Sequence, residues 1–70
     1  MGAAMQAVVA LPFIPTGRIK SFGPFEPKYE VGGPLRQRPD GDWMIEITLV
    51  ESGEKTEYRL SRLADDPDGI

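Results

Sequence analysis

The stretch DWMIEITLV, residues 42–50, gives the clearest secondary-structure signal in the chain. Its apolar side chains stand at alternate positions, and the polar residues Glu46 and Thr48 lie between them. Such alternation is the period of a β-strand with one buried face. We therefore expect a strand that buries one apolar face, made of Trp43, Ile45, Ile47 and Leu49.

A second segment, KTEYRLSRL (55–63), follows the polar residues ESGE and predicts the other arm of a β-hairpin. Pairing Val50 with Lys55 sets Ile47 opposite Tyr58 and keeps Tyr58 and Leu60 on the apolar face. A slip by one residue would move the arm's apolar side chains to the wrong face. A two-residue turn at 52–53 would oppose two glutamates, so a four-residue loop, 51–54, is favoured.

Shorter strand signals precede the hairpin. TGRIKSF (16–22) alternates weakly, PKYEV (27–31) has the pattern of a half-buried strand, and residues 7–11 are compatible with an edge strand. The triplet Gly32-Gly33-Pro34 is expected to end the second of these, and RPDGD (38–42) predicts a turn. The fold class is therefore all-β, a small antiparallel meander of three to five strands with little helix. Curling of such a sheet would give an SH3-like or OB-like barrel.

The 70 residues are enough for one domain. We expect a flexible tail at residues 1–5, a single β domain at 6–64 and an acidic C-terminal tail at 65–70. The apolar N-terminal run lacks a preceding Lys or Arg and is interrupted by Pro12 and Pro15, unlike a signal peptide. It is also too short to span a bilayer.

The stretch FGPFEPKYEVGGP, residues 22–34, is rich in aromatic residues, glycine and proline. One interpretation is a buried corner in which Phe22 and Phe25 cover the apolar face of the sheet. This is favoured, because a chain with six aromatic residues has little else to cover that face. The alternative is an exposed aromatic and proline-lined groove that binds extended peptides.

The composition argues against catalysis. The chain contains no cysteine and no histidine, so it lacks a thiolate nucleophile and the usual general base at neutral pH. The aspartates at 40, 42, 65, 66 and 68 do not have EF-hand spacing, and there is no phosphate-binding glycine loop. We expect a protein that is not an enzyme, with no catalytic residue, cofactor or metal.

Two binding functions remain. The preferred one is a protein-interaction module, with another protein or a second copy of the chain as partner. The alternative is a small nucleic-acid-binding barrel, with Phe22 or Tyr29 stacking on bases beside a basic stripe. Residues 39–70 contain nine acidic and three basic residues, a field that weakens phosphate binding. The basic stripe would consist of Arg18, Lys20, Lys28, Arg36 and Arg38.

Three stretches resemble a family of short, uncharacterised bacterial proteins: GRIKSFGPFEPKYEVGGP, DGDWMIEI and ESGEKTEYRLSRLADDP. The resemblance covers most of residues 17–67. Its shared motifs belong to turns and strands, so they identify relatives rather than a reaction. The resemblance implies a bacterial protein located in the cytoplasm, and it transfers no catalytic residue to this chain.

Overall fold

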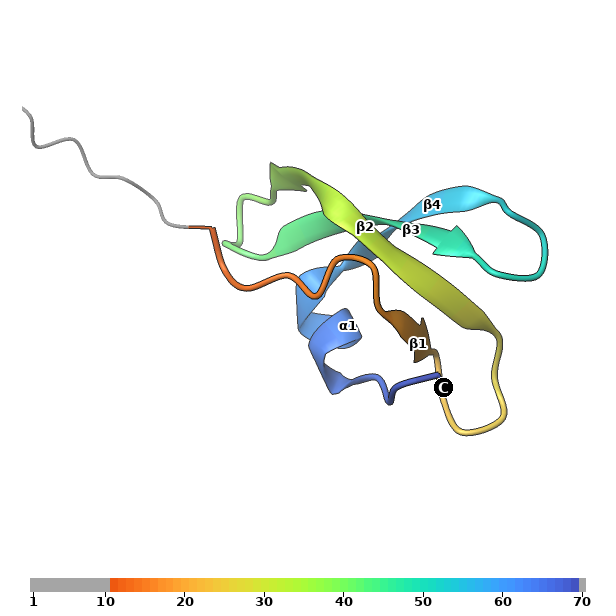
Figure 1. Cartoon of the computed structure of the whole chain (residues 1–70). Helices are drawn as coiled ribbons and strands as arrows, with labels where there is room; N and C mark the ends of the chain where they lie inside the picture. Colours follow the sequence, from red (N-terminus) through yellow and green to blue (C-terminus); the bar gives the residue numbers. More distant parts are fainter. Residues whose placement is uncertain (1–10, 70) are drawn as a thin grey trace, which may run out of the picture.

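The computed structural model describes residues 11–69, which form one antiparallel sheet followed by a short helix (Figure 1). The sheet order is β1-β2-β3-β4, so each strand pairs with its neighbour in sequence. The predicted meander is therefore confirmed. The elements are β1 (Ile19–Ser21), β2 (Lys28–Gln37), β3 (Trp43–Leu49), β4 (Lys55–Arg59) and α1 (Leu60–Asp65). The predicted tail at 1–5 and nearly all of the predicted edge strand at 7–11 lie outside the described residues.

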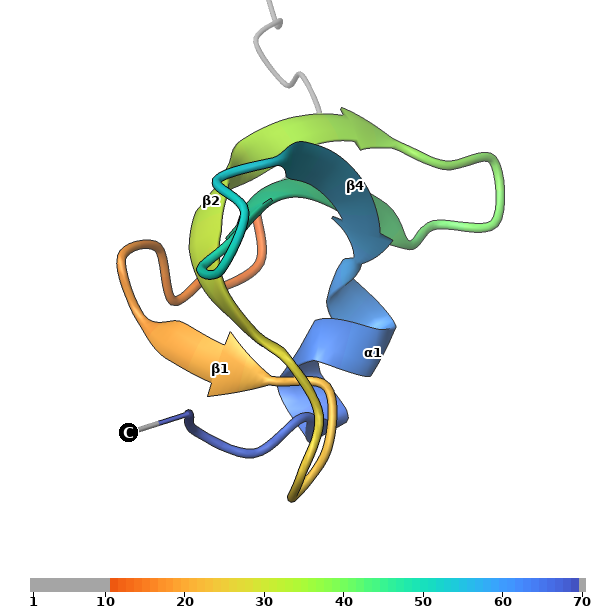
Figure 2. The same cartoon turned by 90° about the vertical axis from the view of Figure 1, so that its right-hand side faces the viewer.

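The sheet is curled but does not close into a barrel, since β1 and β4 do not pair. Figure 2 shows α1 lying in the opening between these two edge strands. The edge of β1 that does not face β2 pairs with the C-terminal segment. The Ser21 N–H donates to the Pro67 carbonyl at 2.9 Å, and the Gly69 N–H donates to the Ile19 carbonyl at 2.9 Å. The SH3-like or OB-like closure is therefore not formed, and residues 67–69 of the predicted tail lie against the sheet.

The core lies between the concave face of the sheet and α1. Its buried residues come from β2, β3 and α1: Tyr29, Val31, Ile45, Ile47 and Leu63. Partly buried side chains surround them: Ile14, Phe22, Trp43, Leu49, Tyr58 and Leu60. The apolar face predicted for the hairpin is thus confirmed, although Leu60 reaches it as the first residue of α1 rather than from a strand.

The predicted register of the hairpin is wrong by two residues. Ile45, not Ile47, lies opposite Tyr58, and Ile47 lies opposite Thr56. The loop still contains four residues, 50–53, closed by a hydrogen bond from the Leu49 N–H to the Glu54 carbonyl at 2.8 Å. Gly53 has a φ of 74°, which glycine adopts without strain. The need to place glycine at this last loop position accounts for the shift.

Strand β2 continues through Gly32, Gly33 and Pro34, where the sequence predicted its end. Irregularities in its pairing with β3 on both sides of Pro34 absorb the extra residues as bulges. Proline is tolerated at such positions because they make no regular ladder hydrogen bond. At Gly32 the backbones of β2 and β3 approach so closely that only glycine fits. A Cβ at this position would lie 2.7 Å from the Glu46 carbonyl oxygen of β3.

Gly32→Ala is expected to destabilise the domain by about 1–3 kcal/mol, because the added methyl group forces two backbones apart. Gly33→Ala is the matched control, since no atom lies within 4 Å of its Cβ position and its φ is not positive. That control is expected to be neutral or slightly stabilising. Urea denaturation of both variants measures the difference, and equal midpoints would show that the close approach is not a constraint.

Candidate interaction site

The loop between β1 and β2, residues 22–27, is held by its own backbone hydrogen bonds; we call it the braced loop. The Phe22 N–H donates to the Pro27 carbonyl at 3.2 Å. Within it, the Glu26 N–H donates to the Gly23 carbonyl at 3.2 Å, which defines a four-residue turn with Pro24 and Phe25 at its centre. Proline at the first central position fixes φ in advance, so the turn is favoured before any tertiary contact forms.

Ser21, a buried polar residue at the base of the braced loop, adds side-chain contacts. Its hydroxyl contacts the Gly23 carbonyl and donates to the Glu26 carbonyl at 3.1 Å, and it accepts from the Gly23 N–H at 3.3 Å. One buried hydroxyl therefore fixes both ends of the turn. Side-chain to backbone bonds of this kind stabilise turns that a flexible chain would sample only in part.

The two phenylalanines of this loop have different environments. Phe22 packs inward, with its ring centroid 4.6 Å from that of Tyr29 and 5.2 Å from that of Tyr58. Phe25 is 99 % exposed at the tip of the turn. The predicted aromatic corner is therefore right for Phe22 and wrong for Phe25. The alternative, a peptide groove, required both rings to be exposed and adjacent. Only Phe25 is exposed, so the two rings do not form such a groove.

A second feature is a hollow of about 540 Å³ between the segment 13–18 and α1. Its apolar lining includes the buried Leu63 and the partly buried Ile14 and Leu60. Phe13, which is 84 % exposed, belongs to the same lining. The polar side chains of the lining include Arg18, Lys20 and Asp68. We call this hollow the basic groove.

The five predicted basic residues do not form one free stripe. Arg36 forms two hydrogen bonds to the carboxylate of Glu57, at 2.7 and 3.0 Å. Arg18 pairs with Asp68 at 3.3 Å, and Arg38 pairs with Asp40 at 3.3 Å. The other two are Lys20, in the basic groove, and Lys28, beside the braced loop at the start of β2.

These pairs also affect titration. The hydrogen bond from the Arg36 guanidinium lowers the pKa of the Glu57 carboxyl.

Three of the five predicted cations have a carboxylate partner within the domain. The aromatic residues expected to stack on bases are engaged too, because Tyr29 is buried and Phe22 packs on it.

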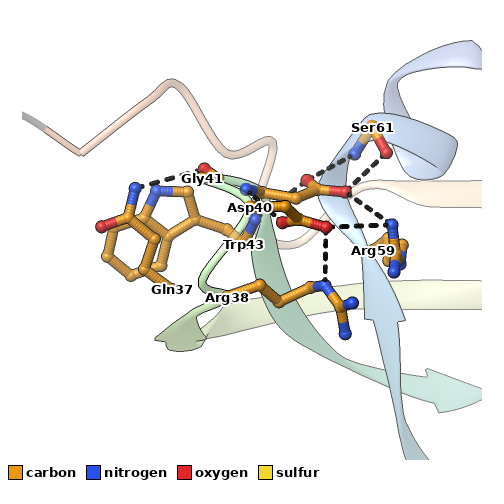
Figure 3. A network of polar contacts seen from close by, with 8 residues as sticks. Gln37, Arg38, Asp40, Gly41, Trp43, Arg59 and Ser61 are labelled. Atoms are coloured by element: carbon orange, nitrogen blue, oxygen red, sulfur yellow. Dashed lines mark hydrogen bonds and ion pairs between the residues drawn. The ribbon is translucent and has the colours of Figure 1, made fainter.

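A polar network joins the turn between β2 and β3 to the start of α1 (Figure 3). The predicted turn is present, with a bond from the Gly41 N–H to the Arg38 carbonyl at 2.9 Å and a φ of 94° at Gly41. Asp40 lies between Arg38 and Arg59, and the Ser61 hydroxyl donates to Asp42 at 2.7 Å. All these partners belong to the chain itself, so the network holds the fold together.

The C-terminal segment is anchored by Asp66. One oxygen of its carboxylate, Oδ2, accepts hydrogen bonds from the Tyr29 hydroxyl at 2.7 Å and from the Tyr58 hydroxyl at 2.9 Å. Burial, followed by the hydrogen bond to Asp66, raises the pKa of both phenols above the ordinary value. The sequence does not predict this role, because an aspartate in an acidic tail carries no signal for a contact 37 residues away.

This arrangement predicts a loss of stability at alkaline pH. The phenols lose their protons in the unfolded chain near pH 10 but at higher pH in the folded one. Their contribution to stability is therefore complete below about pH 10 and is lost as pH rises towards the folded pKa values. Urea midpoints measured up to pH 11 test this. Tyr29→Phe should flatten the alkaline decline, and an unchanged profile would contradict the assignment.

Within residues 11–69, no three His, Cys, Asp or Glu side chains are grouped so as to hold a metal ion. The described part of the chain also contains no helix with the length and apolar character needed to cross a membrane.

Comparison with known proteins agrees with the shared motifs. The model of a family of unknown function, DUF5397, matches residues 7–69. The chain belongs to this family. A Haemophilus influenzae relative, described as an uncharacterized protein, is 54 % identical over 55 residues, which is 79 % of this chain and 87 % of that protein. The resemblance to short uncharacterised bacterial proteins is thus confirmed, and family membership by itself assigns no function.

Proposed function

We propose that this protein acts without catalysis, by binding a protein partner, and that Phe25 is its main contact. The observation that supports this is the 99 % exposure of Phe25 on a loop held by Ser21. Burying a phenylalanine side chain stabilises a complex by roughly 1.5–3 kcal/mol. Because the loop is already fixed in one conformation, little entropy is lost when a partner covers the ring.

The turn itself favours a recognition role for this ring. Gly23 is buried, and Pro24 and Pro27 stand on either side of Phe25 and Glu26. A loop with only a structural role would be expected to direct both of its large apolar side chains towards the core, whereas this loop does so with Phe22 alone. Aromatic residues are enriched at the centres of protein interfaces, where a few side chains carry most of the affinity.

Nucleic-acid binding by Arg18, Lys20, Lys28, Arg36 and Arg38 has weaker support. Three of these side chains pair with acids of the domain, and the two aromatic residues suggested for stacking pack inside it. Such a function would need exposed rings beside free cations. It would appear as DNA or RNA binding at low salt that disappears as salt is added.

The test compares Phe25→Ala with Leu35→Ala, a control at another exposed apolar side chain. The tagged chain and both variants are expressed in the native host, and a co-purifying protein is then titrated in pure form. We expect binding to weaken roughly thirtyfold or more for Phe25→Ala and to stay unchanged for Leu35→Ala. Thermal melts should match the parent, since both side chains are exposed. Equal affinity of the two variants would overturn the proposal.

A further inference from the structure

The braced loop and the basic groove adjoin the same short strand, β1. Lys20 of β1 lines the groove, and the loop begins directly after Ser21, the last residue of that strand. Phe25 lies five positions after Lys20, so their Cα atoms are at most about 18 Å apart. A protruding aromatic ring and an apolar hollow therefore lie close together on one molecule.

The two features are complementary in chemistry. The tip of the loop presents Phe25 next to Glu26, and both side chains are exposed. The groove combines an apolar lining with the cations of Arg18 and Lys20. Within residues 11–69, Lys20 forms no ion pair. The ion pair between Arg18 and Asp68 is exposed to solvent, and an exposed ion pair contributes little to the stability of the fold.

We infer that the basic groove receives the braced loop of a second copy of this chain. Phe25 of one copy packs on Phe13, Ile14 and Leu60 of the other, and its Glu26 faces Lys20. Because the loop and the groove adjoin on each molecule, a twofold axis between two copies lets the loop of each enter the groove of the other. This is the arrangement of a closed symmetric dimer. This inference rests on the proposed function and names the partner of Phe25. Small single-core domains commonly gain stability from such association.

Sedimentation velocity of the pure full-length chain over a wide concentration range tests the inference. We expect a reversible dimer. Phe25→Ala should weaken dimerisation roughly thirtyfold or more, and Leu35→Ala should leave it unchanged. A chain that remains monomeric at every concentration, or a dimer indifferent to Phe25→Ala, would overturn the inference.

Charge reversal tests the pairing of Glu26 with Lys20. Glu26→Lys and Lys20→Glu are each expected to weaken the dimer roughly tenfold or more, because like charges then face each other. The double variant restores the opposite charges and should recover most of the affinity. Glu51→Lys, the same change on another exposed loop, is the control. Failure of the double variant to recover, with melts like the parent, would contradict the inferred contact.

The two proposals fail in different ways. A monomeric chain that still binds another protein through Phe25 would overturn the dimer and leave the proposed function intact. A chain in which Phe25→Ala changes neither dimerisation nor binding to any purified partner would overturn both.

Discussion

Ile47→Ala is expected to leave the domain largely unfolded at room temperature. Ile47 is fully buried in the middle of β3, with Val31 of β2 and Thr56 of β4 as its cross-strand neighbours. Truncation of such a side chain costs roughly 2–5 kcal/mol, through lost burial and the cavity left behind. A domain of this size has a total stability near 5 kcal/mol, the low end of the usual range.

The measurement is a thermal melt followed by circular dichroism. Val50→Ala provides the control, because Val50 belongs to the same hairpin but is 54 % exposed in its loop. The control should change stability by no more than about 0.5 kcal/mol. A cooperative melt of Ile47→Ala close to that of the parent would show that this face of β3 is not the core.

The second large effect is expected for Asp66→Ala. The change leaves the Tyr29 hydroxyl buried without an acceptor, which costs about 1–3 kcal/mol, and Tyr58 loses its acceptor as well. It also frees the segment that pairs with β1. Asp65→Ala is the neighbouring control, since Asp65 is exposed. Urea denaturation should separate the two variants clearly.

A double-mutant cycle with Tyr29→Phe makes this prediction specific. If the phenol and the carboxylate interact as the structure shows, Asp66→Ala costs less once the phenol is gone. We expect a coupling energy of about 0.5–3 kcal/mol, the range for residues in direct contact. Additive effects of the two changes would mean that Asp66 does not anchor the C-terminal segment through Tyr29.

The sequence was sufficient to predict which faces of the strands are buried. The alternation in β3 identified Ile45 and Ile47, because a period of two has no other regular explanation. The register was beyond this argument, since a slip of two residues keeps every side chain on its face. The position of Gly53 decided it, through the positive φ that the loop requires there.

Other features depended on tertiary contacts. Gly32-Gly33-Pro34 resembles a strand end, yet bulges and the close approach at Gly32 let β2 continue through it. Composition could not predict that Phe22 packs inward while Phe25 is exposed. Their positions in the turn decide this, and these positions follow from hydrogen bonds to Ser21 and Gly23 that only the folded loop shows.

The claim that Phe25 is a binding contact can be tested most directly by site-specific photocrosslinking in the native host. A photoreactive phenylalanine analogue, benzoylphenylalanine, replaces Phe25 in one strain and Leu35 in another. Because position 25 is fully exposed at the tip of the braced loop, the analogue fits there without disturbing the fold. We predict a discrete light-dependent adduct from position 25 that position 35 does not give. No adduct from position 25 above that from position 35 would contradict the claim.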